Sequence, residues 1–197
     1  IDSVDKSKLN ELRTKLGAND GDFVIGFAGR LVRDKGIIEL VRAYKALRGV
    51  HPNVRLMLVG MLEIRDALPE DVVKVIQEDE GIIKTGNVGY AEIEYYYALM
   101  NVFVLASYRE GFPTSVLEAS SMGLPVITTK ATGCIDSIID GETGIFVNHD
   151  DKELLMALSS LYENEDKRRM MGAAGRQYVI DHFNQELVWR EIEKLYK

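Results

Sequence analysis

Short runs of apolar residues alternate along the chain with longer segments whose apolar positions recur every three or four residues. Runs that are apolar on both faces indicate strands covered on both sides, and strands that alternate with helices form parallel sheets. The pattern predicts an α/β fold, a doubly wound parallel sheet of the Rossmann-like kind. The expected strands cover residues 23–28, 54–60, 81–86, 102–107, 125–129 and 144–147, and the helices between them include residues 37–47, 91–100 and 114–123.

The last quarter of the chain, from Asp150 onward, has a helical pattern. Its first segment opens with acidic residues, as a helix N-terminus favours, and carries one apolar stripe: Leu154, Leu155, Leu158 and Leu161. A second helix is indicated by Met170, Met171 and Tyr178, and a third by residues 183–196. We interpret these stripes as core packing and not as a cofactor site.

Composition narrows the class of protein. The chain has 197 residues, of which 46% are hydrophobic and 28% charged, so we expect one domain, residues 1–197, with a sizeable core. A formal net charge of −7 argues against a nucleic-acid partner, which needs a surplus of Lys and Arg on one face. Cys134 is the only cysteine, which excludes an intrachain disulfide and a cysteine zinc site.

Nothing in the sequence has the length of a membrane span. No apolar run approaches the roughly 20 residues needed to cross a bilayer, and the start does not resemble a signal peptide. Because the chain opens at Ile1 and not at a methionine, we expect it to be a piece of a longer protein.

The segment GRLVRDKG, residues 29–36, follows the first expected strand and leads into the helix expected from Ile37. In such sheets, ligands bind in the loops beyond the carboxyl ends of the strands. The loop lacks the dinucleotide-binding glycine pattern. However, Gly29 permits close backbone approach, and Arg30 and Lys35 place two cations beside a helix N-terminus, where an anion gains from free amides. We interpret it as a phosphate clamp, with a solvated basic loop as the alternative.

The segment EGFPTSVLE, residues 110–118, has a glutamate at each end of a turn that precedes a helix. Ser115 and Glu118 have the spacing of a capping box, which would explain Glu118 structurally. Glu110 is not explained in this way, and the Gly-Phe-Pro turn directs backbone amides toward the pocket, where they attract phosphate. Carboxylates fit beside a phosphate if they bind hydroxyls. We therefore hypothesise a diphosphate flanked by two sugars, with Glu110 on the transferred sugar and Glu118 on a ribose.

Two further segments carry weaker signals. Residues 85–92, TGNVGYAE, place two glycines around Val88, a backbone-rich loop that can frame a flat base. Asp20 and Asp22 match the D-x-D pattern of metal-dependent transferases, but they precede the first strand, at the wrong end of the sheet. We interpret them as part of a turn and expect neither a metal nor a cofactor.

Three segments together, GRLVRDKG, EGFPTSVLEASSMGLPVITT and GCIDSIIDGETGIFV, strongly resemble the C-terminal, donor-binding domain of retaining nucleotide-sugar glycosyltransferases of the GT-B fold. The resemblance is to the group 1, family 4 type that builds bacterial polysaccharides and lipopolysaccharides, and it covers residues 1–197. It implies that Arg30 and Lys35 stabilise the departing nucleoside diphosphate, that Glu110 orients the donor sugar and that Glu118 binds the ribose. It also implies donor contacts from Gly29, Val88, Gly111, Phe112, Pro113, Thr114, Ser115 and Val116.

The same resemblance implies that an N-terminal, acceptor-binding domain is absent from this chain. We therefore expect this fragment to bind a nucleotide-sugar weakly and not to turn over alone. Met61 and Leu62 depart from relatives that carry a glycine there, while Glu63 and Asp66 resemble relatives that use UDP-sugars, which favours a UDP-sugar donor. The implied partners are the missing domain, the donor and a glycan or lipid-linked acceptor. The implied location is the cytoplasm, with peripheral contact at the inner face of the cell membrane through the missing domain as an alternative.

The expected third C-terminal helix carries apolar residues that admit two interpretations. In the GT-B arrangement this helix crosses back to the first domain, which would leave Leu187, Trp189 and Ile192 without their partner here. We favour packing of Trp189 on this domain, because tryptophan is rarely left exposed.

Three alternatives to a transferase stay open. A nucleotide-sugar epimerase of the same fold would use a similar cleft, but it gives no reason for the glutamate pair. A phosphorylase normally carries a lysine-bound pyridoxal phosphate, and no segment here matches that site. In a non-catalytic α/β nucleotide-binding module, the two glutamates and the two cations would be surface residues.

Overall fold

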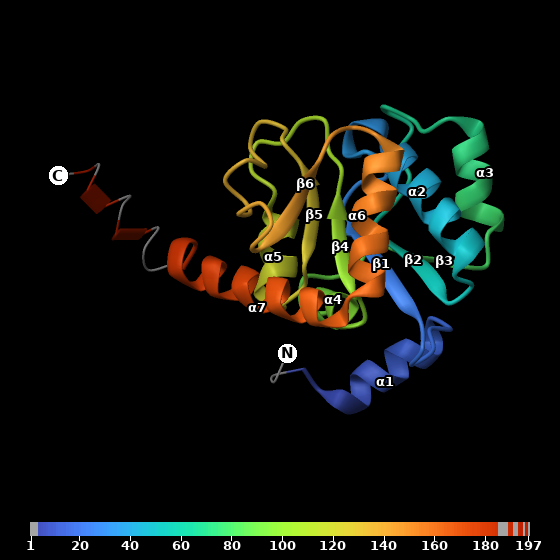
Figure 1. Cartoon of the computed structure of the whole chain (residues 1–197), viewed down its shortest axis with the longest axis horizontal. Coiled ribbons are helices and arrows are strands. Elements are labelled where there is room, and N and C mark those ends of the chain that lie inside the picture. The colour runs from blue at the N-terminus through green and yellow to red at the C-terminus, as the bar shows by residue number, and fades with distance from the viewer. Residues whose placement is uncertain (1–3, 185–188, 191–192, 195, 197) are drawn as a thin grey trace.

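The computed structural model describes residues 4–184, 189, 190, 193, 194 and 196, and it contains a six-stranded sheet flanked by helices (Figure 1). All six predicted strands are confirmed, with ends that differ by at most two residues. The strands are β1 (Phe23–Ala28), β2 (Val54–Val59), β3 (Ile82–Gly86), β4 (Val102–Leu105), β5 (Val126–Thr129) and β6 (Gly144–Val147). The helices are α1 (Lys6–Lys15), α2 (Ile37–Val50), α3 (Glu70–Glu78), α4 (Ile93–Ala98), α5 (Thr114–Ser121), α6 (Asp151–Glu163) and α7 (Glu165–His182), with a short 3-10 helix, η1 (Arg33–Lys35).

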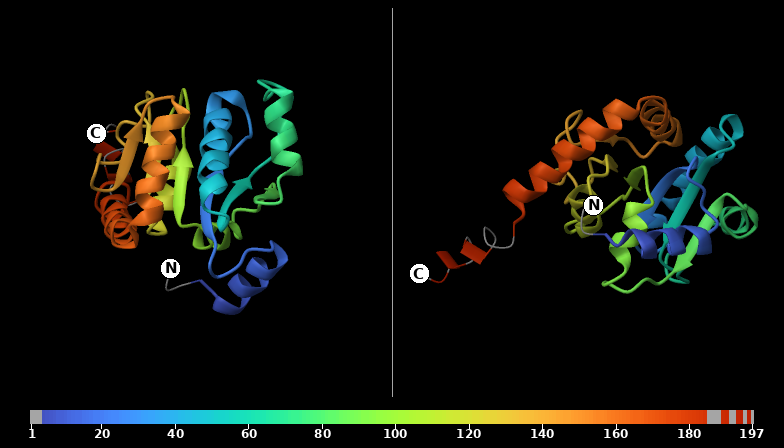
Figure 2. Two further views of the ribbon diagram at one scale, coloured as in Figure 1. Left: turned by 45° about the vertical axis from the view of Figure 1, so that its right-hand side comes forward. Right: turned by 90° about the horizontal axis from the view of Figure 1, so that it is seen from below.

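The sheet has the order β3-β2-β1-β4-β5-β6, and all of its pairs are parallel. The chain runs outward from β1 to β3, returns to β4 beside β1, and runs outward again to β6. Helices α2, α3 and α6 stand side by side over one face (Figure 2, left). Helix α7 contacts both α6 and α5. The predicted doubly wound fold is therefore confirmed.

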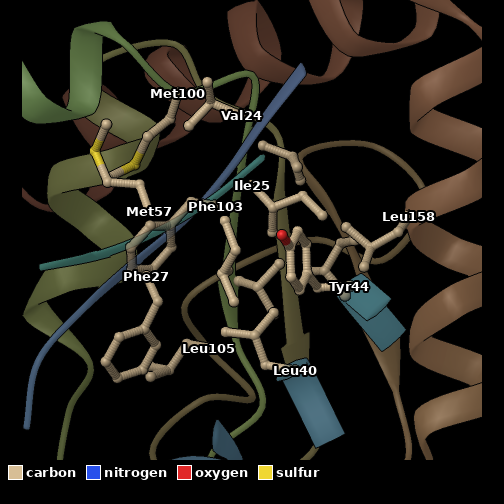
Figure 3. Packing of buried hydrophobic residues seen from close by; sticks show 14 of the residues in the cluster. Val24, Ile25, Phe27, Leu40, Tyr44, Met57, Met100, Phe103, Leu105 and Leu158 are labelled. Atoms are coloured by element: carbon tan, nitrogen blue, oxygen red, sulfur yellow. The ribbon is translucent and has the colours of Figure 1, made fainter. Parts of the chain in front are cut away.

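One apolar cluster joins the sheet to the helices on its faces. In Figure 3, Tyr44 of α2 and Leu158 of α6 point toward the strands near Ile25, and all three side chains are fully buried. The buried Tyr44 hydroxyl donates a hydrogen bond to Asp79 at 3.2 Å, as a polar group removed from water requires. This packing fixes the strands whose carboxyl ends carry the candidate site.

The C-terminal helices confirm most of the predicted stripe residues. In α6, Leu154, Leu158 and Leu161 are buried, and the N-cap Asp150 accepts hydrogen bonds from two amides of the first turn. In α7, Met171 is buried, but Met170 is 74% exposed, because neighbouring positions on a helix point 100° apart. Met170 was therefore wrongly expected in the core.

The predicted third helix, residues 183–196, falls partly outside the described residues, and so do Leu187 and Ile192. Trp189 is described and is 56% exposed. The interpretation that Trp189 packs on this domain is therefore wrong. Among the described residues, no helix combines the length and the apolar content needed to cross a bilayer.

Candidate functional site

The carboxyl ends of β1 and β4 mark the point where the winding of the sheet reverses. The two strands are neighbours, with Ile25 opposite Val102, yet the chain continues from β1 to β2 on one side and from β4 to β5 on the other. The connections that follow the two strands therefore lead to opposite halves of the sheet, and the loops that begin them are residues 29–36 and 106–113. Doubly wound sheets bind their ligands in the crevice at this position.

A pocket of about 530 Å³ lies at this crevice. Among the sequence-predicted residues, it is lined by Gly29, Arg30, Val88, Ser115 and Glu118. Met61 and Leu62, which depart from the family pattern, line it as well, together with Tyr97, which the sequence analysis did not select. The pocket thus gathers residues from four separate segments of the chain.

The first loop is held against β4 by a glycine. Gly36 has a φ of 69°, and a Cβ atom added there would lie 2.1 Å from the carbonyl oxygen of Ala106, at the end of β4. Only glycine fits a left-handed position with this contact. Helix α2 begins directly after it, at Ile37, as predicted, so Gly36 fixes where the neighbouring Lys35 enters the site.

Lys35 and Glu110 form an ion pair. The Lys35 Nζ atom lies 2.5 Å from Glu110 Oε1, and the two side chains are only 17% and 11% exposed. The sequence analysis assigned these residues to two different parts of a ligand and did not predict this contact. The structure places a cation and a carboxylate in direct contact between the loops after β1 and β4, and neither side chain is among those that line the pocket.

Arg30 forms a separate and looser pair. Its guanidinium lies 3.2 Å from Glu63 Oε2, and the side chains are 63% and 35% exposed. Because an exposed pair contributes little to stability, Arg30 can exchange Glu63 for an anionic ligand at small cost. The two predicted cations, Arg30 and Lys35, are thus each paired with a different glutamate.

Asp66 has a structural role in the described structure. Its Oδ2 atom accepts a hydrogen bond from the Asp34 amide at 2.8 Å, and its carbonyl oxygen accepts one from the Arg33 amide at 3.2 Å. The residue does not line the pocket. Asp66 therefore ties the loop after β2 to the loop that carries Lys35.

Glu118 does not have the capping role that its spacing with Ser115 suggested. Helix α5 begins at Thr114 and its N-cap is Pro113, so Ser115 already lies inside the first turn. The Glu118 carboxylate instead accepts a hydrogen bond from the Tyr97 hydroxyl at 2.8 Å. The capping-box interpretation is therefore wrong, and Glu118 is available to the pocket.

The turn before α5 offers free backbone donors. Within the described part of the chain, the amides of Gly111 and Phe112 donate to no other group. Gly133 packs closely against this turn, since a Cβ atom added to it would lie 2.4 Å from the Glu110 carbonyl oxygen. Val116, in contrast, is completely buried, so its side chain faces the core and not the pocket. Unpaired amides at a helix N-terminus attract anions.

The expected turn at Asp20 and Asp22 is confirmed. Both residues precede β1, at the end of the sheet opposite the pocket, and they pair with Arg13 and Arg55. Within the described residues, no group of three or more His, Cys, Asp or Glu side chains could hold a metal ion.

Comparison with known proteins identifies relatives of the whole chain. Residues 9–178 match the family model described as "Glycosyl transferases group 1". The capsular polysaccharide biosynthesis glycosyltransferase CapM of Staphylococcus aureus is 36% identical over 194 residues, which is 98% of this chain and 50% of CapM. The chain therefore spans about half the length of this relative.

Solved structures share the fold. Sucrose-phosphate synthase from Thermosynechococcus elongatus has a TM-score of 0.81 at 28% identity, over 96% of this chain and 49% of that one. The C-terminal domain of the group 1 protein LpcC from Francisella tularensis has a TM-score of 0.80 at 23% identity, over 93% and 95%. Anabaena HepE in complex with UDP-glucose has a TM-score of 0.85 at 22% identity, over 98% and 53%.

Proposed function

Because the chain belongs to the group 1 glycosyl transferases, we propose that it is the donor-binding half of a transferase that uses a nucleoside-diphosphate sugar. We further propose a UDP-sugar as donor, a glycan or lipid-linked acceptor, and retention of configuration at the transferred carbon. The acceptor would bind to the other half of the longer protein. The UDP-glucose named in the HepE complex supports the choice of donor.

One observation carries the proposal: two carboxylates flank a set of free amides at the point where the sheet reverses. Glu118 lines the pocket together with Val88 and Arg30, and we assign this pocket to the nucleoside. Glu110 lies beyond the unpaired amides of Gly111 and Phe112 and is paired with Lys35. A ligand with an anion in its middle and hydroxyls at both ends matches this order of groups.

The proposed reaction breaks the bond between the sugar carbon and the diphosphate oxygen, and the electron pair stays on that oxygen. Negative charge therefore grows on the outer phosphate during the reaction. Lys35, held by Glu110, and the amides at the start of α5 are in place before the ligand binds, so they stabilise the growing charge with little reorganisation, and Arg30 joins them by exchanging Glu63 for the ligand. Glu110 would hold hydroxyls of the transferred sugar and keep Lys35 in place.

The proposal is tested by calorimetric titration of this chain with UDP, GDP, ADP and inorganic phosphate. We expect weak binding that is selective for UDP and is weakened about tenfold in Glu118→Ala, because hydrogen bonds from the ribose hydroxyls to a charged group are lost. Glu142→Ala is the matched control, because Glu142 is an exposed glutamate away from the pocket. Equal affinity for UDP in the two variants, or no binding of any nucleotide to the unmodified chain, would contradict the proposed function.

The catalytic roles require the longer protein. In it, Lys35→Ala should lower sugar transfer by orders of magnitude, because the developing charge loses its buried cation. We expect the 197-residue chain to bind donor without transferring it. Unchanged turnover in Lys35→Ala would refute the role given to that residue.

A further inference from the structure

Tyr97 is a buried polar group at the pocket whose function the proposed reaction does not explain. It lies on α4, is 1% exposed and lines the pocket. Its ring packs edge-on against Phe103 of β4, with centroids 5.7 Å apart, so the ring position is fixed by the core. The hydroxyl at the end of this fixed ring donates a hydrogen bond to Glu118.

Because of this hydrogen bond, the two oxygens of the Glu118 carboxylate are not equivalent. Oε2 accepts the Tyr97 hydroxyl at 2.8 Å, and no other hydrogen bond to the carboxylate occurs within the described residues. Oε1 therefore keeps its full accepting capacity. A glutamate normally loses considerable side-chain freedom when it binds a ligand, and an oxygen already fixed by a buried donor avoids part of that loss.

Tyr97 stays a donor across the whole physiological pH range. Burial, and then the negative charge of Glu118, raise the pKa of Tyr97 far above its ordinary value. The phenol therefore keeps its proton beside the carboxylate and cannot turn from donor to acceptor.

We propose that Tyr97 is a positioning residue that fixes Glu118 for recognition of the ribose hydroxyls. The inference rests on the proposed function, because it takes the ligand to be a ribonucleoside diphosphate. According to this inference, selectivity for ribose depends on Tyr97 of α4, which acts through the Glu118 carboxylate. The consequence is specific: loss of the Tyr97 hydroxyl should weaken only ligands that carry ribose hydroxyls.

The test compares UDP with 2′,3′-dideoxy-UDP by calorimetry. Tyr97→Phe keeps the ring against Phe103 and removes only the hydroxyl. We expect it to weaken UDP about fivefold, because Glu118 must then lose side-chain freedom when the ligand binds, and to change the affinity for dideoxy-UDP less than about twofold. Tyr96→Phe is the matched control, since Tyr96 is the adjacent tyrosine and faces a different groove; it should change neither affinity.

A second variant separates positioning from packing. In a Glu118→Ala background, Tyr97→Phe should cause no further loss of UDP affinity, because the carboxylate that it positions is gone. Equal weakening of UDP and dideoxy-UDP by Tyr97→Phe, or a full further loss in the double variant, would overturn the inference and leave the proposed function standing. Absence of UDP binding to the unmodified chain would overturn both.

Discussion

Gly36 lies so close to the end of β4 that a larger residue at this position should lower the stability of the fold measurably. Replacement of Gly36 by alanine would place a Cβ atom 2.1 Å from the Ala106 carbonyl oxygen, well inside the 3.0 Å that real Cβ atoms respect. The obstacle is backbone and not the end of a flexible side chain. Either β4 or the loop that carries Lys35 must therefore move by about 0.9 Å.

The cost can be separated into two parts with a control that the chain itself provides. Gly17 has a similar φ, 64° against 69°, but an added Cβ there meets nothing within 4 Å. Gly17→Ala should cost about 1 kcal/mol, which is the penalty of a left-handed alanine less the gain from a stiffer unfolded chain. Gly36→Ala should cost this amount and a further 1–3 kcal/mol or so for the overlap, a total of roughly 2–4 kcal/mol.

Thermal and urea unfolding of the two variants test this reasoning. In a domain of this size, 1 kcal/mol shifts Tm by roughly 2–4 °C, so Gly36→Ala should unfold well below Gly17→Ala. Gly36→Ala should also weaken UDP binding, because Lys35 is its neighbour in sequence, whereas Gly17→Ala should not. Equal losses of Tm in the two variants would show that the Ala106 contact carries no cost and would refute the argument.

Two further predictions concern charges. Lys35→Met should lower the free energy of unfolding by about 3 kcal/mol, because it leaves Glu110 largely buried without a partner. The double variant Lys35→Met/Glu110→Gln should recover most of that loss, which a double-mutant cycle of urea unfolding would measure. Additive losses in the two single variants would contradict the coupling. Burial alone would raise the pKa of Asp79, but hydrogen bonds from Lys45 and the Gly81 amide outweigh it and lower this pKa. Ionised Asp79 should therefore stabilise the fold above its unfolded-state pKa, and this contribution should be lost as the pH falls through the lower folded-state pKa. The difference in the free energy of unfolding between the unmodified chain and Asp79→Asn should shrink below about pH 4. A difference that stays constant with pH would contradict this prediction.

The sheet could be predicted from sequence because its signal is local. Each strand is a run that is apolar on both faces, and the alternation with helices determines that the strands are parallel. Helices α1 and α3 were not predicted. Helix α1 has no buried residue, and α3 is only nine residues long, so its apolar stripe around the buried Val72 and Ile76 gave too short a signal to be recognised.

The sequence predicted where the candidate residues lie in the fold but not which of them are in contact. Arg30, Lys35, Glu110 and Glu118 all lie at the predicted edge of the sheet, because loop position follows from strand order. The pairing of Lys35 with Glu110 depends on how the loops after β1 and β4 meet, which no local pattern encodes. Tyr97 was missed for the same reason: helical spacing turns one tyrosine of the run at 95–97 inward, but the sequence does not reveal that its hydroxyl meets Glu118.

The separation of the site's two halves along the chain has a consequence for the order of folding. Lys35 and Glu110 are 75 positions apart, and β2 and β3 lie between β1 and β4 along the chain. Closing so long a loop is slow compared with forming local structure. The crevice should therefore be assembled late in refolding, and recovery of nucleotide binding would report completion of the native sheet. A chain that ends before β4 would retain the cationic loop but have no crevice.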